Sequence, residues 1–486
     1  MFRVGKVNNV KNIEYYKNTI ILFLGKFSTQ FISFLLLPLF TRYLTTSDYG
    51  YVDLLQTYIS LLMPICLLRI DSAAFRFLVD ERKNEKKQSQ IISISLALGV
   101  VASIILILLY IILRKIINIK YVFSLVISVI ILIFINIVLQ IVRGLGKNYL
   151  YSITAIVVGV INCIINIILI IVFKWNAESI LISNIISNFL GLIFISIKLN
   201  ILKKIIWNYK NIDKSLISEM IKYSIPMIPN SFSWWIVNVS DRSIISLLIG
   251  ISYNGIYTIS CKFSNILNNI FSVFNMSWTE SASIHIKDKD KNEYFDEMIN
   301  KLFFGFASIG MLIISMLPLI YDSIVGTNYR NSYNYIPILI IAGTIDVLAW
   351  LCGGIYIACK ETKKVAKTTI ISAILNIIIH LSLIKFIGLY AACISTLLSY
   401  LYLSIFRYYD CQKYVQFKIN CKFLTIMILS YIVCVILYYT NILVLNIINF
   451  AISTFVLIII NRQVIIELIT MVKGKLVNEK RVNKKN

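Results

Sequence analysis

Four basic side chains stand inside apolar stretches of this sequence, where a charge needs a partner: Lys26, Arg69, Arg242 and Lys262. A Lys or Arg at the centre of a bilayer costs about 2.5–3.5 kcal/mol on insertion scales, so each must face protein, water or a ligand. Lys26 has no acid within one helical turn, which favours either a cation that faces a cavity or a side chain that snorkels to the interface. The spacing of Arg69 and Arg76 is two helical turns, which favours an anion-facing stripe or a helix end anchored at the inner surface.

Four acidic side chains accompany these cations inside or at the ends of the apolar stretches: Asp71, Asp241, Glu280 and Asp346. One interpretation is that they form neutral pairs that hold helices together, with Asp241 against Arg242 or Lys262 and Asp71 against Arg69 or Arg76. The other is that Asp241, Glu280 or Asp346 carries a coupling ion through a transport cycle. Both interpretations are open at the level of sequence.

The apolar stretches are long enough to cross a bilayer. The 486 residues are 58% hydrophobic, well above the usual 45–50% of soluble domains, and a spanning helix needs roughly 20 apolar residues. The sequence therefore predicts an all-α polytopic membrane protein with about fourteen spans. These lie near residues 17–39, 51–75, 91–113, 121–142, 151–173, 179–197, 223–249, 255–284, 302–320, 333–359, 368–384, 389–406, 423–439 and 443–461.

The basic residues follow the predicted topology. With the N-terminus in the cytoplasm, the inner connections hold 36 Lys and Arg and the outer connections hold 7, as the positive-inside rule requires. This pattern predicts an inner-membrane protein with both termini in the cytoplasm. It explains the net charge of +24 without a nucleic-acid partner. It also places the basic C-terminal tail where it can bind anionic membrane lipids.

Similar features recur about two hundred residues apart, as in a duplicated transporter. The segment 44–50 ends in Tyr49-Gly50 and the segment 249–255 ends in Asn254-Gly255, both on the predicted outer side. A second similarity relates Asn162 in the first half to Asn376 in the second. We therefore predict two pseudo-symmetric six-helix lobes and an added helix pair: an N-lobe with a basic linker at 1–215, a C-lobe at 216–412, and helices thirteen and fourteen with the tail at 413–486.

Several kinds of chemistry lack the residues they need. No G-x-x-x-x-G-K-[ST] loop is present, so ATP hydrolysis is not expected. The sequence has two histidines and nine cysteines without metal-ligand spacing, so we expect no metal site, cofactor or catalytic residue. In helix seven, Pro226 and Pro229 predict a kink near the inner end.

Particular residues resemble the polysaccharide transporter family, the O-antigen and capsule repeat-unit flippases of the multidrug/oligosaccharidyl-lipid/polysaccharide exporter superfamily. The resemblance covers essentially the whole chain. The residues that carry it are Pro38 to Leu44 with Tyr49-Gly50, Pro226, Asp241-Arg242, Gly255-Ile256-Tyr257, Lys262, Lys360 to Lys363 and Asn376. One departure is Thr279-Glu280 after Trp278, where relatives often place a proline.

The resemblance implies a function. It implies that a cavity between two lobes moves an undecaprenyl-diphosphate-linked oligosaccharide by alternating access, for cell-surface polysaccharide synthesis. On that reading the four in-span cations would bind the diphosphate, and a gradient would supply the energy. A polysaccharide polymerase and glycosyltransferases are candidate partners.

Two rival functions differ in the residues they require. A multidrug or cation antiporter of the same superfamily would need an acidic cavity for its cationic cargo, whereas the in-span residues here include basic ones. A membrane polymerase or glycosyltransferase would need a large outer loop, and the predicted outer connections are short. The sequence therefore favours a transporter over an enzyme.

Overall fold

A computed structural model describes the fold over residues 28, 30–114, 120–206, 213–462 and 466. Over that part of the chain the secondary structure is helical, without strands. Ten helices are long and apolar enough to cross a membrane, and the bent pair of α3 and α4 would make eleven. Helices α11 and α12 occupy two more of the predicted stretches. The all-α polytopic class is confirmed, and the first predicted stretch lies mainly outside the described residues.

Internal contacts divide the chain into two compact units, Met1–Gly255 and Ile256–Asn486. Helix α11 packs against α3 and belongs to the first unit, although the sequence assigned it to the second lobe. The division into lobes at residues 215 and 412 stays a prediction.

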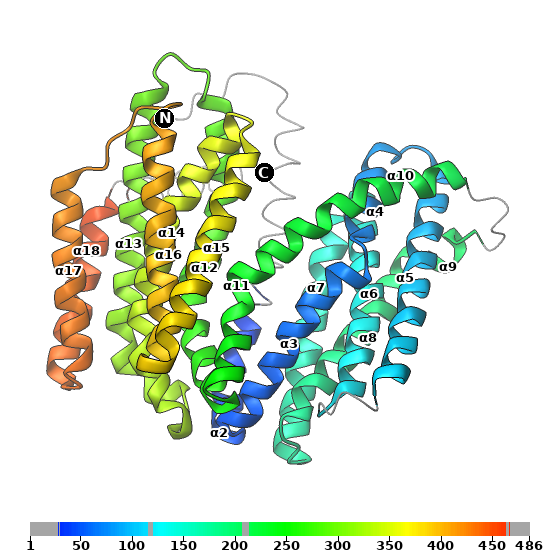
Figure 1. The fold of residues 1–486 in the computed structure, drawn as a ribbon, viewed down its shortest axis with the longest axis horizontal. Coiled ribbons are helices and arrows are strands. Elements are labelled where there is room, and N and C mark those ends of the chain that lie inside the picture. Colours follow the sequence, from blue (N-terminus) through cyan, green and yellow to red (C-terminus); the bar gives the residue numbers. More distant parts are fainter. Residues whose placement is uncertain (1–27, 29, 115–119, 207–212, 463–465, 467–486) are drawn as a thin grey trace, which may run out of the picture. The chain divides into compact units, whose positions relative to one another are not determined.

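The first unit holds the elements from α2 to α11 and the first turn of α12 (Figure 1). Their bounds are α2 Leu37–Tyr43, α3 Thr46–Cys66, α4 Ile70–Asp80, α5 Glu85–Leu113, α6 Val122–Gly144, α7 Asn148–Ile167 with a π-helical end Ile168–Val172, α8 Glu178–Leu199, α9 Ile201–Lys204, α10 Lys214–Ser224 and α11 Ile228–Leu248.

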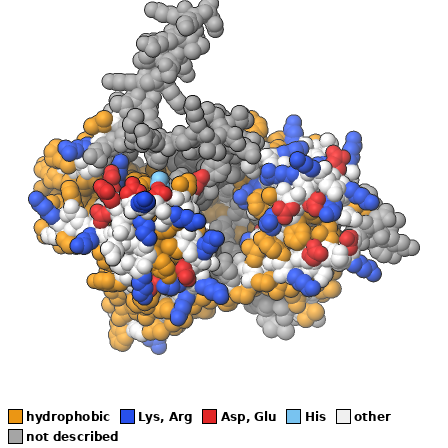
Figure 2. Space-filling model, turned by 90° about the horizontal axis from the view of Figure 1, so that it is seen from above, with side chains coloured by type: hydrophobic (Ala, Val, Ile, Leu, Met, Phe, Trp, Pro, Cys, Tyr) orange, Lys and Arg blue, Asp and Glu red, His pale blue; other side chains and the backbone are white. Residues whose placement is uncertain are grey.

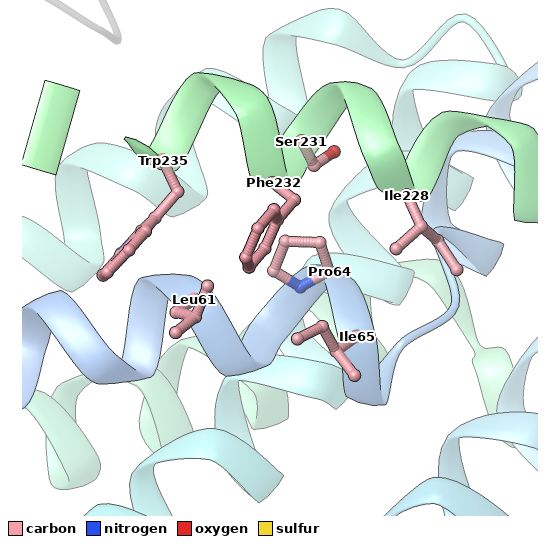
Figure 3. A pocket seen from close by; sticks show the side chains of 7 residues that line it. All are labelled: Leu61, Pro64, Ile65, Ile228, Ser231, Phe232 and Trp235. Carbon is pink, nitrogen blue, oxygen red and sulfur yellow. The ribbon is translucent and has the colours of Figure 1, made fainter. Parts of the chain in front are cut away.

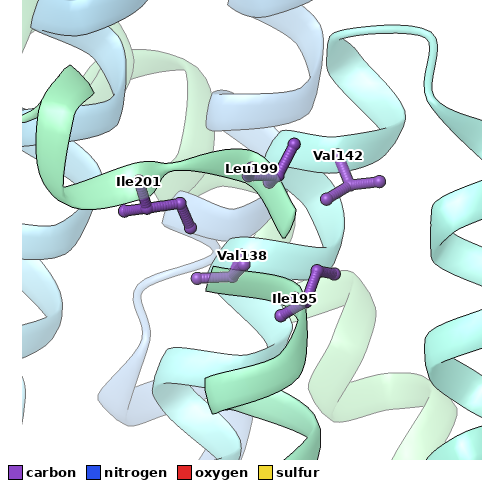
Figure 4. Close-up of a cluster of buried hydrophobic side chains, with 5 residues drawn as sticks. All are labelled: Val138, Val142, Ile195, Leu199 and Ile201. Atoms are coloured by element: carbon purple, nitrogen blue, oxygen red, sulfur yellow. The ribbon is translucent and has the colours of Figure 1, made fainter. Parts of the chain in front are cut away.

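One buried hydrophobic cluster of this unit lies where α6, α8 and α9 meet. It consists of branched side chains: Val138, Val142, Ile195, Leu199 and Ile201 (Figure 4). The Val and Ile side chains keep one preferred rotamer in a helix, so they pack without losing much side-chain entropy.

The second unit holds the rest of α12 Ile251–His285 and the elements up to α18. Their bounds are α13 Lys291–Ile324, a 3₁₀ segment Thr327–Tyr335, α14 Ile336–Ala358, α15 Thr362–Ile387, α16 Leu389–Cys411, α17 Cys421–Tyr439 and α18 Leu443–Ile460. Helix α16 packs against both α14 and α15, and α13 contacts α14, α17 and α18.

The added pair α17 and α18 is hydrogen-bonded to the rest of the second unit at several points along its length. Tyr333 and Tyr438 stack at 4.1 Å between ring centroids, and each hydroxyl donates to the other residue's carbonyl oxygen. Tyr431 Oη donates to the carbonyl oxygen of Ala307 on α13 at 2.7 Å. The faces of α17 and α18 that point away from these contacts expose large apolar side chains such as Phe455, which is 64% exposed. This is typical of helices that face lipid.

The kink predicted at the start of helix seven is confirmed. Helix α10 ends at Ser224, a 3₁₀ turn covers Ile225–Met227, and α11 begins at Ile228. Pro226 and Pro229 lack the amide hydrogens that a continuous α-helix needs. At the other end of α10, Asp213 accepts hydrogen bonds from the hydroxyl and the backbone amide of Ser215, and these hold the pKa of Asp213 below its usual value.

Charged loops and helix ends gather on one end face of each unit, shown in Figure 2. In the first unit the exposed residues with basic side chains include Lys83, Lys86, Lys203, Lys214 and Lys222. All five come from connections that the sequence places on the inner side, so the structure puts the predicted inner loops of this unit together at the helix ends.

The two echoed segments of the sequence lie against each other. Gly50 on α3 and Gly255 on α12 meet backbone to backbone, and Asn254 Nδ2 donates to the carbonyl oxygen of Gly50 at 2.8 Å. A Cβ on Gly50 would lie 2.1 Å from the carbonyl oxygen of Ile251, and one on Gly255 would lie 2.0 Å from that of Thr46. Only glycine permits this crossing of two helices.

We expect Gly50→Ala or Gly255→Ala to destabilise the protein by about 1–3 kcal/mol or more, because the clash is with backbone that cannot move aside. The measurement is thermal unfolding of the purified protein in detergent. The matched control is Gly99→Ala, whose Cβ would come closest to the end of the Ile137 side chain, at 2.8 Å. Unfolding midpoints equal to that of the control would show that the two helices do not cross closely here.

Candidate functional site

The candidate site in the first unit is the break between α3 and α4, which sequence reasoning read as one helix. The two helices are bent by 53°, and Leu68 and Arg69 both have left-handed backbone angles, with φ of 49° and 56°. Such angles are rare for residues other than glycine. Pro64 precedes the break and lacks the amide hydrogen that would continue the helical ladder.

The break places Arg69 at the N-terminus of α4. Arg69 Nη2 donates to Ser72 Oγ, and its Nε lies 3.8 Å from Asp71 Oδ1. That separation is too long for a hydrogen bond, so both Nε and Oδ1 are buried without a hydrogen-bond partner. The Arg69 side chain is 30% exposed. Arg69 is therefore loosely paired with Asp71 and keeps part of its guanidinium accessible beside the start of α4, where the helix dipole also favours an anion.

Arg76, which shares the predicted stripe with Arg69, binds the carboxylate of Asp80 one turn later. Both of these side chains are largely exposed. Lys26, the remaining predicted cation of this unit's first span, lies outside the described residues.

Arg242 forms an ion pair with Asp53, an acid of α3 that sequence reasoning did not single out. Arg242 Nε lies 2.8 Å from Asp53 Oδ2, and the two side chains are only 16% and 15% exposed. Asp241, its neighbour in the sequence, is buried. Asp53 could have been found from the sequence, because it is one more carboxylate inside a predicted span.

In the second unit the predicted residues occupy different environments. Lys262 on α12 is half-buried, and Glu280 near the end of that helix is exposed. Asp346 on α14 is buried and accepts a hydrogen bond from Trp350 Nε1 at 2.8 Å. Trp278 is buried and donates to the carbonyl oxygen of Leu351, so its ring packs between helices of this unit.

Arg407 is a buried cation that the sequence placed in a loop. It lies on α16 and is 3% exposed. Its guanidinium donates to Thr368 Oγ1, Thr369 Oγ1 and the carbonyl oxygens of Ala349 and Val365, at 2.8–3.1 Å. Because these acceptors come from α14 and α15, Arg407 joins three helices of the second unit.

Polar side chains also join neighbouring helices at the echoed asparagines. Asn162 on α7 donates to Asn184 Oδ1 on α8 at 2.8 Å, and Asn376 on α15 donates to Thr396 Oγ1 on α16 at 3.3 Å. Both asparagines therefore hydrogen-bond to a neighbouring helix, as polar side chains in membrane helices commonly do.

Solved structures of membrane transporters resemble this fold. Lipid II flippase MurJ in an inward closed conformation matches with a TM-score of 0.70 and 16% identity, over 93% of this chain and 100% of that one. A multidrug resistance MATE family transporter of the MOP superfamily, inward-facing, matches with 0.65 and 12%, over 79% and 94%. A mutant form of the Vibrio cholerae MATE transporter VcmN matches with 0.55 and 13%, over 82% and 96%.

These likenesses define the class of fold, that of the MOP-superfamily transporters and flippases. The family model described as polysaccharide biosynthesis protein matches residues 15–279, and the chain belongs to that family. No curated protein matches this chain in sequence. The predicted family resemblance is thus confirmed.

We expect Arg407→Ala to destabilise the protein by about 2–4 kcal/mol, because it removes four hydrogen bonds of a charged donor and leaves a cavity among three helices. Thermal unfolding in detergent measures the change. Arg143→Ala is the matched control, since that guanidinium is only half-buried and lies over the rings of Phe75 and Tyr151. Equal unfolding midpoints for both variants would contradict a joining role of Arg407.

Proposed function

We propose that this protein is a flippase that moves an undecaprenyl-diphosphate-linked oligosaccharide across the cytoplasmic membrane by alternating access. The observation that carries the proposal is Arg69, a guanidinium at a broken span that stays 30% exposed and lies 3.8 Å from its counter-charge on Asp71. A diphosphate supplies acceptors of opposite charge, which hydrocarbon cannot. The family described as polysaccharide biosynthesis protein and the fold likeness to a lipid II flippase support the same cargo class.

The orientation in the membrane is part of the proposal. The excess of Lys and Arg in alternate connections favours a cytoplasmic position for both termini, in a bacterial inner membrane. The oligosaccharide would then move outward to a polymerase, after glycosyltransferases have built it on the inner face. The O-antigen and capsule pathways are the candidates, because both assemble such units.

Lys26 and Lys262 complete the proposed set of cargo-binding cations with Arg69. Asp346 is the favoured coupling group, because a buried carboxylate with a neutral donor, Trp350, can exchange its proton or bind a cation as the cycle proceeds. Asp71, Asp241 and Glu280 remain candidates for pairing or coupling.

Loss of gradient dependence in Asp346→Asn, with exchange of cargo retained, would support Asp346 as the coupling group. Retained gradient dependence in this variant would remove Asp346 from that role.

The second candidate function is a multidrug or cation antiporter, favoured by the fold likeness to MATE transporters. An antiporter of this kind must bind a cationic cargo, whereas the proposed flippase must bind an anionic one. A cationic amphiphile would be repelled by Arg69 and a diphosphate would be attracted, so the charge of the transported molecule distinguishes the two functions.

In proteoliposomes loaded with a fluorescent polyprenyl-diphosphate oligosaccharide, we expect Arg69→Gln to slow translocation at least tenfold, because the diphosphate loses a donor that it needs during transport. The loss of fluorescence on adding an impermeant quencher measures translocation. The control Lys86→Gln removes the same charge from an exposed site and should transport at the wild-type rate. Wild-type rates in Arg69→Gln would remove this residue from the mechanism.

A further inference from the structure

Helices α3 and α11 contact each other along their length. The contacts are polar at one end of the pair and mainly apolar at the other. On α3 the contacts fall about one turn apart, and on α11 they run in the opposite direction, so the pair is antiparallel (Figure 1). The ion pair of Asp53 and Arg242 comes first. One turn further along α3, Trp235 Nε1 donates to the carbonyl oxygen of Thr57 at 2.9 Å.

The packing at the opposite end of the two helices is mainly apolar. There a shallow groove lies between the helices. Figure 3 shows its side chains, which are apolar except for the Ser231 hydroxyl and the Trp235 indole N–H: Leu61, Pro64, Ile65, Ile228, Ser231, Phe232 and Trp235. Ile65 and Phe232 are each 44% exposed. Both helices are interrupted near this end, α3 by the break after Cys66 and α11 by the 3₁₀ turn before Ile228.

The end of the α3–α11 pair that holds the Asp53–Arg242 ion pair is more tightly packed than the groove end. Tyr49 is buried on the same helix as Asp53, in the electrostatic field of both charges. The Gly50 and Gly255 backbones meet one turn away. The chain passes into its second unit directly after Gly255, so α11 and the first turn of α12 connect α3 to that unit.

We propose that Asp53 and Arg242 form a latch that holds this end of α3 and α11 closed, and that the latch opens once in each transport cycle. The inference rests on the proposed alternating access. It gives Arg242 a role different from the cargo binding that the sequence suggested. Opening toward the groove end leaves the latch intact, and opening toward the latch end requires the two charges to part.

An ion pair suits a contact that must open to water. Two separated charges are hydrated when water enters, whereas separated apolar faces gain nothing from it, so the pair is tolerated in both states. In the closed state each charge is neutralised at 2.8 Å, which a membrane interior demands. An apolar contact at this end would favour the closed state more strongly and slow the cycle.

The test is the reactivity of a cysteine placed behind the latch, in Thr57→Cys on a cysteine-free background. Thr57 is 3% exposed, so an impermeant maleimide should react slowly while the latch holds. We expect Asp53→Asn to raise the labelling rate at least fivefold, and the charge exchange Asp53→Arg with Arg242→Asp to return it toward the original rate. Asp322→Asn, which neutralises an exposed carboxylate, is the control and should change nothing.

Labelling needs no cargo, so it separates this inference from the proposed function. An unchanged labelling rate in Asp53→Asn would overturn the latch. Size-exclusion profiles identify variants that fail to fold, and the charge exchange then provides the decisive comparison. As a second measurement, a short bifunctional thiol cross-linker between Asp53→Cys and Arg242→Cys should stop translocation in proteoliposomes. Translocation by the cross-linked protein would also overturn the latch, while leaving the flippase function intact.

Discussion

Hydrocarbon cannot solvate a charge, and this constraint shapes each polar feature of the protein. A charge inside a span must be neutralised, hydrogen-bonded or exposed to water or cargo. Arg242 meets the requirement with a carboxylate at 2.8 Å, and Arg407 meets it with four neutral oxygens. Arg69 meets it with a hydrogen bond to Ser72, a carboxylate at 3.8 Å on Asp71 and partial exposure. These differences underlie the roles that we propose for the three arginines: a latch for Arg242, a structural joint for Arg407 and a binding group for Arg69.

Much of the fold could be predicted because membrane helices are specified locally. A run of apolar residues must form a helix to satisfy its own backbone, and prolines at 226 and 229 must interrupt one. The interruption after Cys66 could not be predicted in the same way. Pro64 lies shortly before it, and Leu68 and Arg69 adopt left-handed angles that their side chains do not favour. Tertiary packing overrides local preference at that point.

The candidate site was only partly predictable for a related reason. Sequence identifies which charges lie in spans, but pairing depends on how helices are rotated and which of them are neighbours. Asp53 and Arg242 are far apart in the chain and meet only because α3 packs against α11. Arg407 was assigned to a loop because α16 extends further than its apolar run. The echoed glycines were recognised as a repeat, and their direct contact was not foreseen.

The charge preference for the lipid headgroup tests the central claim most directly. Native mass spectrometry of the purified protein would compare a polyprenyl diphosphate with the polyprenol of the same chain length and with a quaternary ammonium amphiphile. The account predicts at least tenfold tighter binding of the diphosphate, a difference of about 1.4 kcal/mol. Equal affinity for the three lipids, or tighter binding of the cation, would contradict it.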